Sequence, residues 1–389
     1  MFDPTSREGS PAARFLLTAL AIAAVFILFA FIIPTPEIPL PATDQTDEGE
    51  TLTGRVALVL SEETAQVGGT EQWTQQLEVQ ITTGSLKGET VTLRRGGEVM
   101  ATKYTRMRPG DQILLQRLPS EGGSVLHVFD FIREPALLWL TLLFAGVAIL
   151  VGKWTGVRSL LGAAFGALIV LRFILPRMLA GHNPLLVSLA GAAILIAVSQ
   201  YLVYGFKWKI HAALSGVILS LAITSVLAIF FTWWAKITGL GSEEAPLLAL
   251  AAGTYIDLRG LVLAQVIIGS LGVLDDICVG QASAIFQLRS ANPRLDWQQL
   301  FRHGIAIGRD HIGAMVNTLL LVYIAASLPL FALLSLQRFS WRLLINQEFL
   351  AEEIILTLVG SLGLMLAMPI TSLVASRLAV RTAAVEDRP

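Results

Sequence analysis

The chain has 389 residues, of which 54% are hydrophobic and only 15% are charged, and its formal net charge is −1. Soluble globular proteins carry about 25% charged residues, so this composition excludes an ordinary soluble domain and indicates several membrane spans. The net charge gives no general attraction to nucleic acid. We therefore expect the lipid bilayer as a partner, and no nucleic acid.

The first apolar segment covers residues 15–33. It is longer than the apolar region of about 7–15 residues in a signal peptide, and no small-x-small cleavage site follows it. We therefore predict that residues 1–34 are a cytoplasmic N-terminus and an uncleaved first transmembrane anchor. The Pro-rich, acidic stretch over 35–50 predicts a flexible linker.

Residues 51–133 change in character, because short strand-like runs alternate there with Gly-rich or polar turns. Five such runs predict a small extracytoplasmic β domain, a barrel of the OB or SH3-like kind, inserted between the first and second spans. We assign this domain a binding or gating role. The runs are 51–60, 73–83, 89–95, 111–118 and 124–132.

Seven further apolar runs make residues 134–377 a helical membrane core, with residues 378–389 as a cytoplasmic tail. The predicted fold class is thus a membrane all-α bundle of about eight transmembrane helices that carries the small β domain. Lys and Arg are more frequent at one set of span ends, which predicts that both termini are cytoplasmic. The seven runs are 135–151, 157–175, 184–204, 210–234, 262–287, 312–336 and 352–376.

A shorter apolar run over 245–258 follows Ser242, which is a candidate helix N-cap. This run is too short to cross a bilayer. It could lie in the membrane interface, or it could enter the membrane and return, as interrupted helices do around transporter sites. The sequence leaves both alternatives open.

The sixth predicted span, 262–287, has one polar face. An ionised Asp in hydrocarbon costs about 2.5–3.5 kcal/mol, so we expect this face, with its buried Asp276, to point at protein or at a water-filled cavity. The glycines on the face favour close helix packing. Seven residues share it at steps of three and four: Gln265, Gly269, Gly272, Asp276, Gly280, Ser283 and Gln287.

Asp275 and Asp276 point about 100° apart on a helix, so they do not share one ligand. No third acid follows at the spacing of a magnesium site, and we expect no metal and no cofactor. A buried carboxyl here is better suited to taking up and releasing a proton. Alternatively, Asp276 could simply be neutralised by a hydrogen bond or an Arg from another helix. The one cysteine, Cys278, is expected to be inert packing.

The seventh span begins with a second polar group. Asp310 and His311 are predicted at its inner edge, and Asn317 about two turns further along could bond across to the sixth span. Alternatively, Asn317 could only hold two helices together by a hydrogen bond, and His311 could be an ordinary residue of the membrane–water interface.

Two motifs in these spans carry a resemblance. The series Gly269-x-x-Gly272-x-x-x-Asp276, followed by Gln281-Ala282-Ser283-Ala284, is similar to the YibE/F-like family of bacterial membrane proteins. So is Ile307-Gly308-Arg309-Asp310-His311 followed by Asn317-Thr318-Leu319. The resemblance covers 135–377 and implies a multispan protein of the bacterial cytoplasmic membrane that is connected with transport. Asp276 matches the family's acid, whereas Asp275 stands where many members carry an apolar residue.

We therefore expect a secondary transporter or channel-like carrier for a small solute or ion, not an enzyme. The predicted path comprises Asp276, Asp275, Gln265, Ser283, Gln287, Asn317, Asp310 and His311. One alternative is a non-transporting sensor or assembly protein that acts through 51–132 as a homo-oligomer or with an envelope partner. Another is an intramembrane hydrolase that pairs Asp257 with Asp276. Such a pair needs carboxylates about 3 Å apart, whereas nineteen helical residues span about 28 Å.

Overall fold

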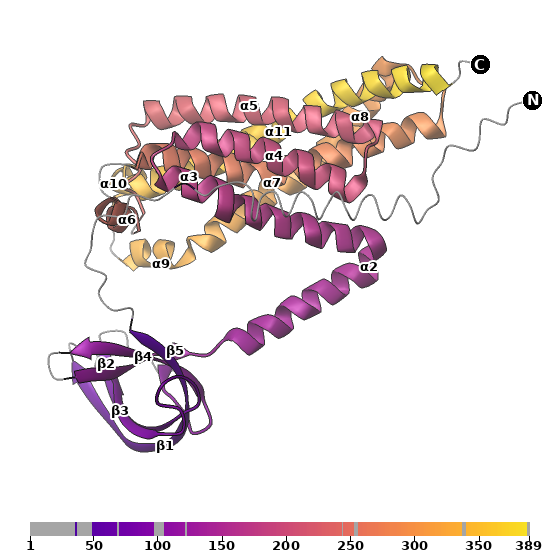
Figure 1. Ribbon diagram of the computed structural model, residues 1–389. Coiled ribbons are helices and arrows are strands. Elements are labelled where there is room, and N and C mark those ends of the chain that lie inside the picture. The colour runs from indigo at the N-terminus through magenta and orange to yellow at the C-terminus, as the bar shows by residue number, and fades with distance from the viewer. Residues whose placement is uncertain are drawn as a thin grey trace, which may run out of the picture. The chain divides into compact units, whose positions relative to one another are not determined.

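The structure is a computed structural model, and its described residues fall in two compact units, one reaching Val147 and the other beginning at Ala148 (Figure 1). The predicted first span, 15–33, and most of the predicted linker lie outside the described residues. Each unit is considered by itself below. The described residues are 36, 49–67, 70–96, 105–120, 123–242, 244–252, 256–336 and 340–386.

The first unit contains a curled antiparallel sheet of five strands in the order β3-β2-β1-β4-β5, which forms a half-barrel. The five predicted strands are confirmed. Side chains alternate along them, and the inward ones, such as Leu52, Leu77 and Leu115, are fully buried. The strands are β1 (Glu50–Val67), β2 (Thr70–Ile81), β3 (Thr90–Gly96), β4 (Gln112–Ser120) and β5 (Gly123–Phe131).

An ion pair closes the end of the sheet where the chain leaves β5. The Arg133 guanidinium donates to both carboxylate oxygens of Asp130, at 2.7 and 3.0 Å. These hydrogen bonds lower the pKa of Asp130, and the Phe131 amide adds to the effect. Any contribution of this exposed pair to stability is therefore present above the ordinary pKa of an Asp and is lost as the pH falls through the lowered value.

The chain after β5 enters α2 (Glu134–Ile169), which is broken at Lys153, where φ is 51° and ψ is −129°. The helix resumes at once, and Gly156 is required there because a side chain would overlap the carbonyl oxygen of Ala148. The predicted spans 135–151 and 157–175 therefore lie on the two sides of this break. The second continues through a π-helical turn, η3 (Val170–Ile174), into α3 (Leu175–Leu179).

Several helices differ from their predicted bounds, the largest differences being at α8, α9 and α11. Helix α8 (Trp297–Ala326) begins at Trp297, because Asp296 and Gln299 form a capping box there. Most of the predicted loop before residue 312 is therefore helical. The predicted span 312–336 is wrong as one helix: it is divided at Ser327, two residues before Pro329. The last helix runs on to Glu386. The remaining elements are α4 (Pro184–Tyr204), α5 (Trp208–Trp234), α6 (Glu244–Ala252), α7 (Leu258–Ala291), α8 (Trp297–Ala326), α9 (Leu328–Leu336), α10 (Trp341–Ile345) and α11 (Glu348–Glu386).

The second unit is built around α5, α7 and α11, which pack side by side (Figure 1). Two glycine–threonine contacts bring α5 and α11 close together. A side chain on Gly216 would overlap Thr371, and one on Gly363 would overlap Thr224. Thr371 is held in turn by its hydroxyl, which donates to the buried Cys278 thiol at 3.0 Å. Cys278, expected to be inert packing, has a buried side chain.

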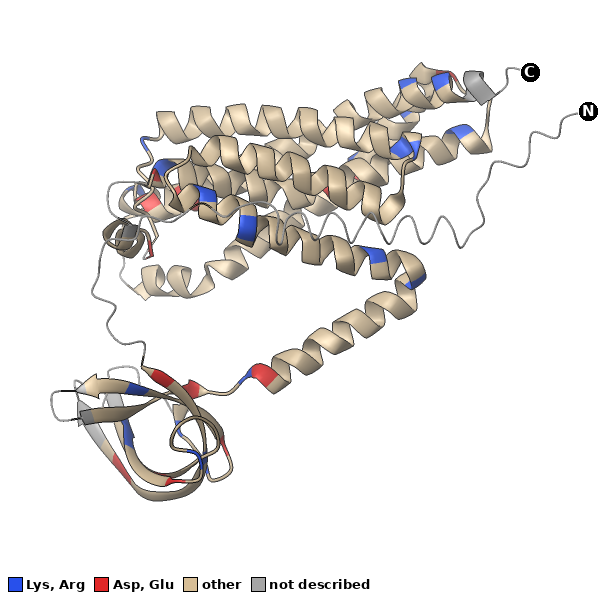
Figure 2. Ribbon diagram, in the orientation of Figure 1, with Lys and Arg blue, Asp and Glu red and all other residues tan. Residues whose placement is uncertain are grey.

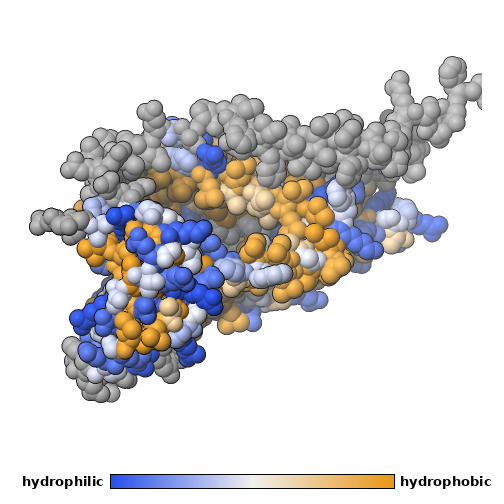
Figure 3. Space-filling model, turned by 60° about the horizontal axis from the view of Figure 1, so that its bottom comes forward, coloured by the Kyte–Doolittle hydropathy of each residue, from blue (hydrophilic) through white to orange (hydrophobic). Residues whose placement is uncertain are grey.

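The outer surfaces of these helices are apolar. Among the described residues, six helices are long and apolar enough to cross a membrane. Large apolar side chains such as Leu150 and Val151 are about four-fifths exposed, and Figure 3 shows apolar residues over much of the visible helical surface. Charged residues lie mostly toward the helix ends (Figure 2). This distribution is that of a membrane protein. The predicted first span lies outside the described residues, and the candidate Glu134–Leu179 contains two predicted spans, so the total of eight stays a prediction.

Replacing Gly216 by Ala is expected to destabilise the bundle by about 1–3 kcal/mol, because the restrained Thr371 cannot yield space to the new methyl group. Gly313→Ala on α8 is the matched control, since no atom would lie within 4 Å of its methyl group. A glycine-to-alanine change in an open helix position stabilises by about 0.5–1 kcal/mol. Thermal unfolding of the purified protein in detergent measures both. Equal melting temperatures for the two variants would refute the predicted close packing.

Candidate functional site: the polar face of α7

The central helix α7 has two contrasting faces. One is buried against α4, α5 and α11 through residues such as Ile267, Leu274 and Ile285. The polar face lies on the opposite side of the helix. Gln265, Gly269, Gly272, Asp276, Gly280 and Gln287 are all exposed there, and Ser283 is partly exposed.

The predicted burial of Asp276 is therefore wrong. No Asp, Glu, Lys or Arg is among the buried side chains of the described residues. The helical wheel correctly identified the residues that share this face. The neighbouring helices, however, pack against the opposite face of α7. The exposed face lies between the helices that flank α7, with α8 on one side and α4 with η3 on the other.

Asp275, not Asp276, makes the interhelical hydrogen bond. The Gln200 amide of α4 donates to its carboxylate at 2.6 Å, and Gln200 is almost fully buried. Asp275 points about 100° away from Asp276 on the helix, and this direction faces α4. The bond therefore ties two spans together and sets the rotation of α7 relative to α4.

Gln281 forms a second polar connection, which the sequence analysis missed. Its buried side-chain amide donates to the Gly304 carbonyl of α8 at 2.7 Å and to the Ser372 hydroxyl of α11 at 2.8 Å. One side chain thus joins three helices. A glutamine among small residues in an apolar span was the available signal, but a single sequence does not say which helices it meets.

The glycines of the polar face are mostly uncovered. Gly269 faces the Tyr323 hydroxyl and Leu356, each 3.8 Å from where a side chain would begin. Gly272 and Gly280 have no described atom within 4 Å of that point. The close helix packing predicted at these two glycines is therefore absent from the described residues, because no described helix crosses the face there.

A pocket of about 570 Å³ lies at one end of the polar face, between α7, α8 and α11, and is named here the His311 pocket. Asp310 and His311 line it together with Gly280 and Gln281. Both polar residues stand in the middle of α8, because this helix begins fifteen residues before the predicted span, and their place at the inner edge of the membrane stays a prediction. The structure thus brings Asp310 and His311 beside the polar face of α7.

Asn317, Ser283 and Gln287, which also belong to the predicted path, do not line the His311 pocket. Asn317 is exposed on α8, and no hydrogen bond from it to α7 is found among the described residues. Ser283 lies 3.4 Å from the Lys209 ammonium, which points a cation at the end of the polar face. Gln287 is exposed one turn beyond.

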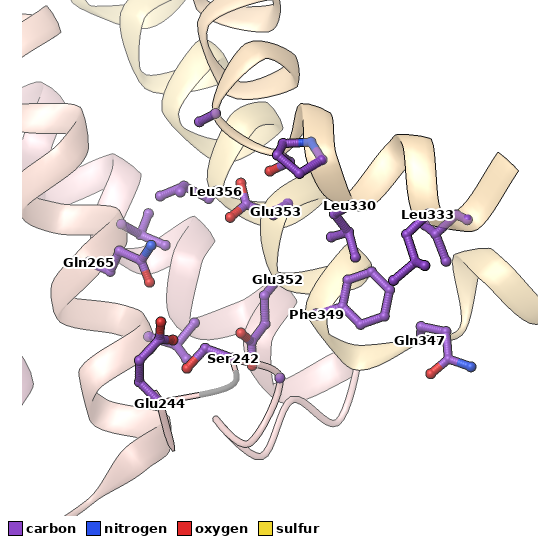
Figure 4. A pocket seen from close by; sticks show the side chains of 17 residues that line it. Ser242, Glu244, Gln265, Leu330, Leu333, Gln347, Phe349, Glu352, Glu353 and Leu356 are labelled. Carbon is purple, nitrogen blue, oxygen red and sulfur yellow. The ribbon is translucent and has the colours of Figure 1, made fainter. Parts of the chain in front are cut away.

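A larger pocket of about 960 Å³ lies at the other end and is named here the acidic pocket. Gln265 of α7, Glu244 of α6, and Glu352 and Glu353 of α11 project toward it (Figure 4). The sequence analysis missed these three carboxylates, although Glu352 and Glu353 open the predicted span 352–376. Four separate segments form the pocket, and only the folded chain brings them together.

The loop beside the acidic pocket is anchored by a carboxylate. Glu348 accepts hydrogen bonds from the Thr238 amide and hydroxyl and from the Gly239 amide, at 2.6–2.8 Å. Gly239 has φ of +88° and abuts the Leu258 backbone, so only glycine suits that position. The start of α11 thereby holds the chain that leads into α6.

Two expectations near α6 have clear outcomes. The Ser242 hydroxyl accepts from the Ala245 amide at 3.1 Å, which confirms the predicted cap. Asp257 accepts from the Gly260 amide at 2.9 Å and caps α7, which then runs unbroken past Asp276. A dyad of Asp257 with Asp276 is therefore excluded, because about 28 Å of helix separates them.

The family model described as YibE/F-like protein matches residues 140–381. This chain belongs to the YibE/F-like family. No curated protein and no solved structure matches the chain significantly. The match covers the helices that form the polar face and both pockets, and together with the six candidate spans it indicates a multi-pass membrane protein. Among the described residues, no group of three or more His, Cys, Asp or Glu could hold a metal ion.

We expect the bond between Gln200 and Asp275 to stabilise the fold. Changing either residue to Ala should lower stability, and the double variant should be less than additive by about 0.6–1.7 kcal/mol, the range for polar bonds between membrane helices. Asp276→Ala is the matched control, because the neighbouring carboxylate is exposed and should change stability little. Unfolding of the three variants in mixed micelles gives the coupling energy, and a coupling of zero would contradict the bond.

Proposed function

We propose that this protein is a secondary carrier of the bacterial cytoplasmic membrane, and that its solute moves along the polar face of α7. The observation that supports this most is the position of the face, which joins the acidic pocket at Gln265 to the His311 pocket at Gly280. Fifteen helical residues separate these two positions, or about 22 Å, most of the thickness of a hydrocarbon core.

Asp276 stands between the two pockets on this face. A carboxylate in hydrocarbon costs about 2.5–3.5 kcal/mol, so its exposed position favours water along the face, not lipid. A carboxyl group between two aqueous ends can gain a proton from one side and release it to the other. Proton coupling of this kind is the role proposed for Asp276, with His311 and Asp310 as neighbours on the route.

The proposed topology follows from the Lys and Arg at the helix ends. Lys207 and Lys209 at the start of α5, and Arg289 and Arg294 around the end of α7, belong to one end of the bundle, which we assign to the cytoplasm. Residues 1–34 and 378–389 then lie at that side, and the β domain over 51–133 lies outside. In this orientation the acidic pocket opens outward, and the α6 region lies at the outer interface.

An envelope sensor remains the second candidate, and the exposed apolar side chains of the sheet favour it. Leu118 and Val125 are directly opposed on β4 and β5, and both are more than a third exposed. Phe129, in the bulge of β5, is 63% exposed. Such residues suit contact with another envelope protein.

Asp276→Asn is expected to abolish solute flux, because an amide cannot exchange a proton, while Asp276→Glu keeps part of it. Flux is measured in proteoliposomes under a pH gradient, over a panel of ions and small metabolites. Folding of each variant is checked by its melting temperature.

Glu89→Gln is the control, since Glu89 is an exposed residue of the β domain. Undiminished flux in Asp276→Asn would remove this residue from the mechanism. If deleting 51–132 abolished function in cells while Asp276→Asn preserved it, the sensor would be the better account.

A further inference from the structure

The acidic pocket has a one-sided charge. Glu244, Glu352 and Glu353 line it, and no Lys, Arg or His is among the lining residues that the structure describes. None of the ion pairs formed by the described residues involves these three carboxylates. The described lining of the pocket therefore offers negative charge without a cation, and a bound ligand would be the counterion.

One of these carboxylates is incompletely satisfied. The Oε1 atom of Glu352 is buried and makes no hydrogen bond within the described structure. Its neighbour Glu348, one turn earlier, accepts hydrogen bonds from the loop at Thr238. A buried carboxylate oxygen without a partner is unfavourable, so a positively charged or hydrogen-bonding group on a ligand would satisfy it.

The opposite wall of the pocket is apolar. Leu330 and Leu333 of α9 and Phe349 of α11 contribute to it, as Figure 4 shows. Volumes of about 300–1,000 Å³ are typical of sites for small molecules, and this pocket, at about 960 Å³, lies within that range. A ligand that fits both walls has a cationic group beside the carboxylates and an apolar body against the leucines and the phenylalanine.

We infer that the acidic pocket binds an organic cation with an apolar body. A bare metal ion fits less well, because the described residues hold no group of three or more carboxylate, His or Cys side chains close enough to share one. An organic anion would be repelled by all three carboxylates. That this cation is the transported solute rests on the proposed carrier function. That the pocket binds the cation does not depend on the carrier function.

Binding is tested with tetraphenylphosphonium and the full chain in lipid nanodiscs, by equilibrium dialysis against empty nanodiscs. Tetraphenylborate has nearly the same size and shape but the opposite charge, so it separates charge recognition from partition into lipid. We expect saturable binding of the cation only. The double variant Glu352→Gln with Glu353→Gln should weaken it at least tenfold, and Leu330→Trp, which fills the apolar wall, should do the same.

Glu134→Gln, an exposed acid at the start of α2 that does not line the pocket, is the matched control and should bind as the wild type does. Equal binding of the cation to wild type and both pocket variants, or equal saturable binding of the borate anion, would overturn the inference. Charge-selective binding without flux of the cation would leave the pocket assignment standing and count against the carrier. Flux of other solutes without any cation binding would overturn the pocket assignment and leave the proposed carrier function standing.

Discussion

The unequal burial of the two faces of α7 is the constraint on which the helical unit depends. Ile267, Leu274 and Ile285 fill the space among α4, α5 and α11, and their burial leaves no room for a carboxylate on that side. Asp276 must therefore lie opposite, on the face that the described helices leave open. Within a membrane, a charge on that face needs water or a polar partner, so the packing of the core is what makes the proposed path along this face plausible in energy.

Sequence periodicity correctly grouped the residues of the polar and apolar faces of α7. The prediction that the polar face points into the protein was wrong. A helical wheel gives relative directions and contains no information about which direction a neighbouring helix occupies. Small and polar residues are buried in this bundle as well: Ser270 lies within α7, and Thr371 and Ser372 lie in α11. In a membrane, both faces of a helix can be apolar enough to be buried, so polarity alone does not distinguish them.

The five strands were predictable because alternation of period two is a local property of each strand and does not depend on which strands pair, even where β1 pairs with the distant β4. The acidic pocket was not predictable for the opposite reason. Glu244 and Glu352 are more than a hundred residues apart, and the loop that brings them together is held by Glu348 at Thr238 and Gly239. The start of α8 was missed because Asp296 and Gln299 form a cap within a segment too polar to be recognised as part of a span.

The two adjacent carboxylates of α7 have different surroundings: Asp275 is hydrogen-bonded to another helix, and Asp276 is exposed. Asp275 is held by Gln200 at 2.6 Å, and this bond fixes the rotation of α7 against α4. Because successive residues on a helix point about 100° apart, fixing Asp275 also fixes the direction of Asp276 on the open face. A mobile Asp276 could swing toward lipid or toward the core, and both positions would be costly. The hydrogen-bonded residue thus positions the exposed one, which explains why two acids can stand side by side in a single span.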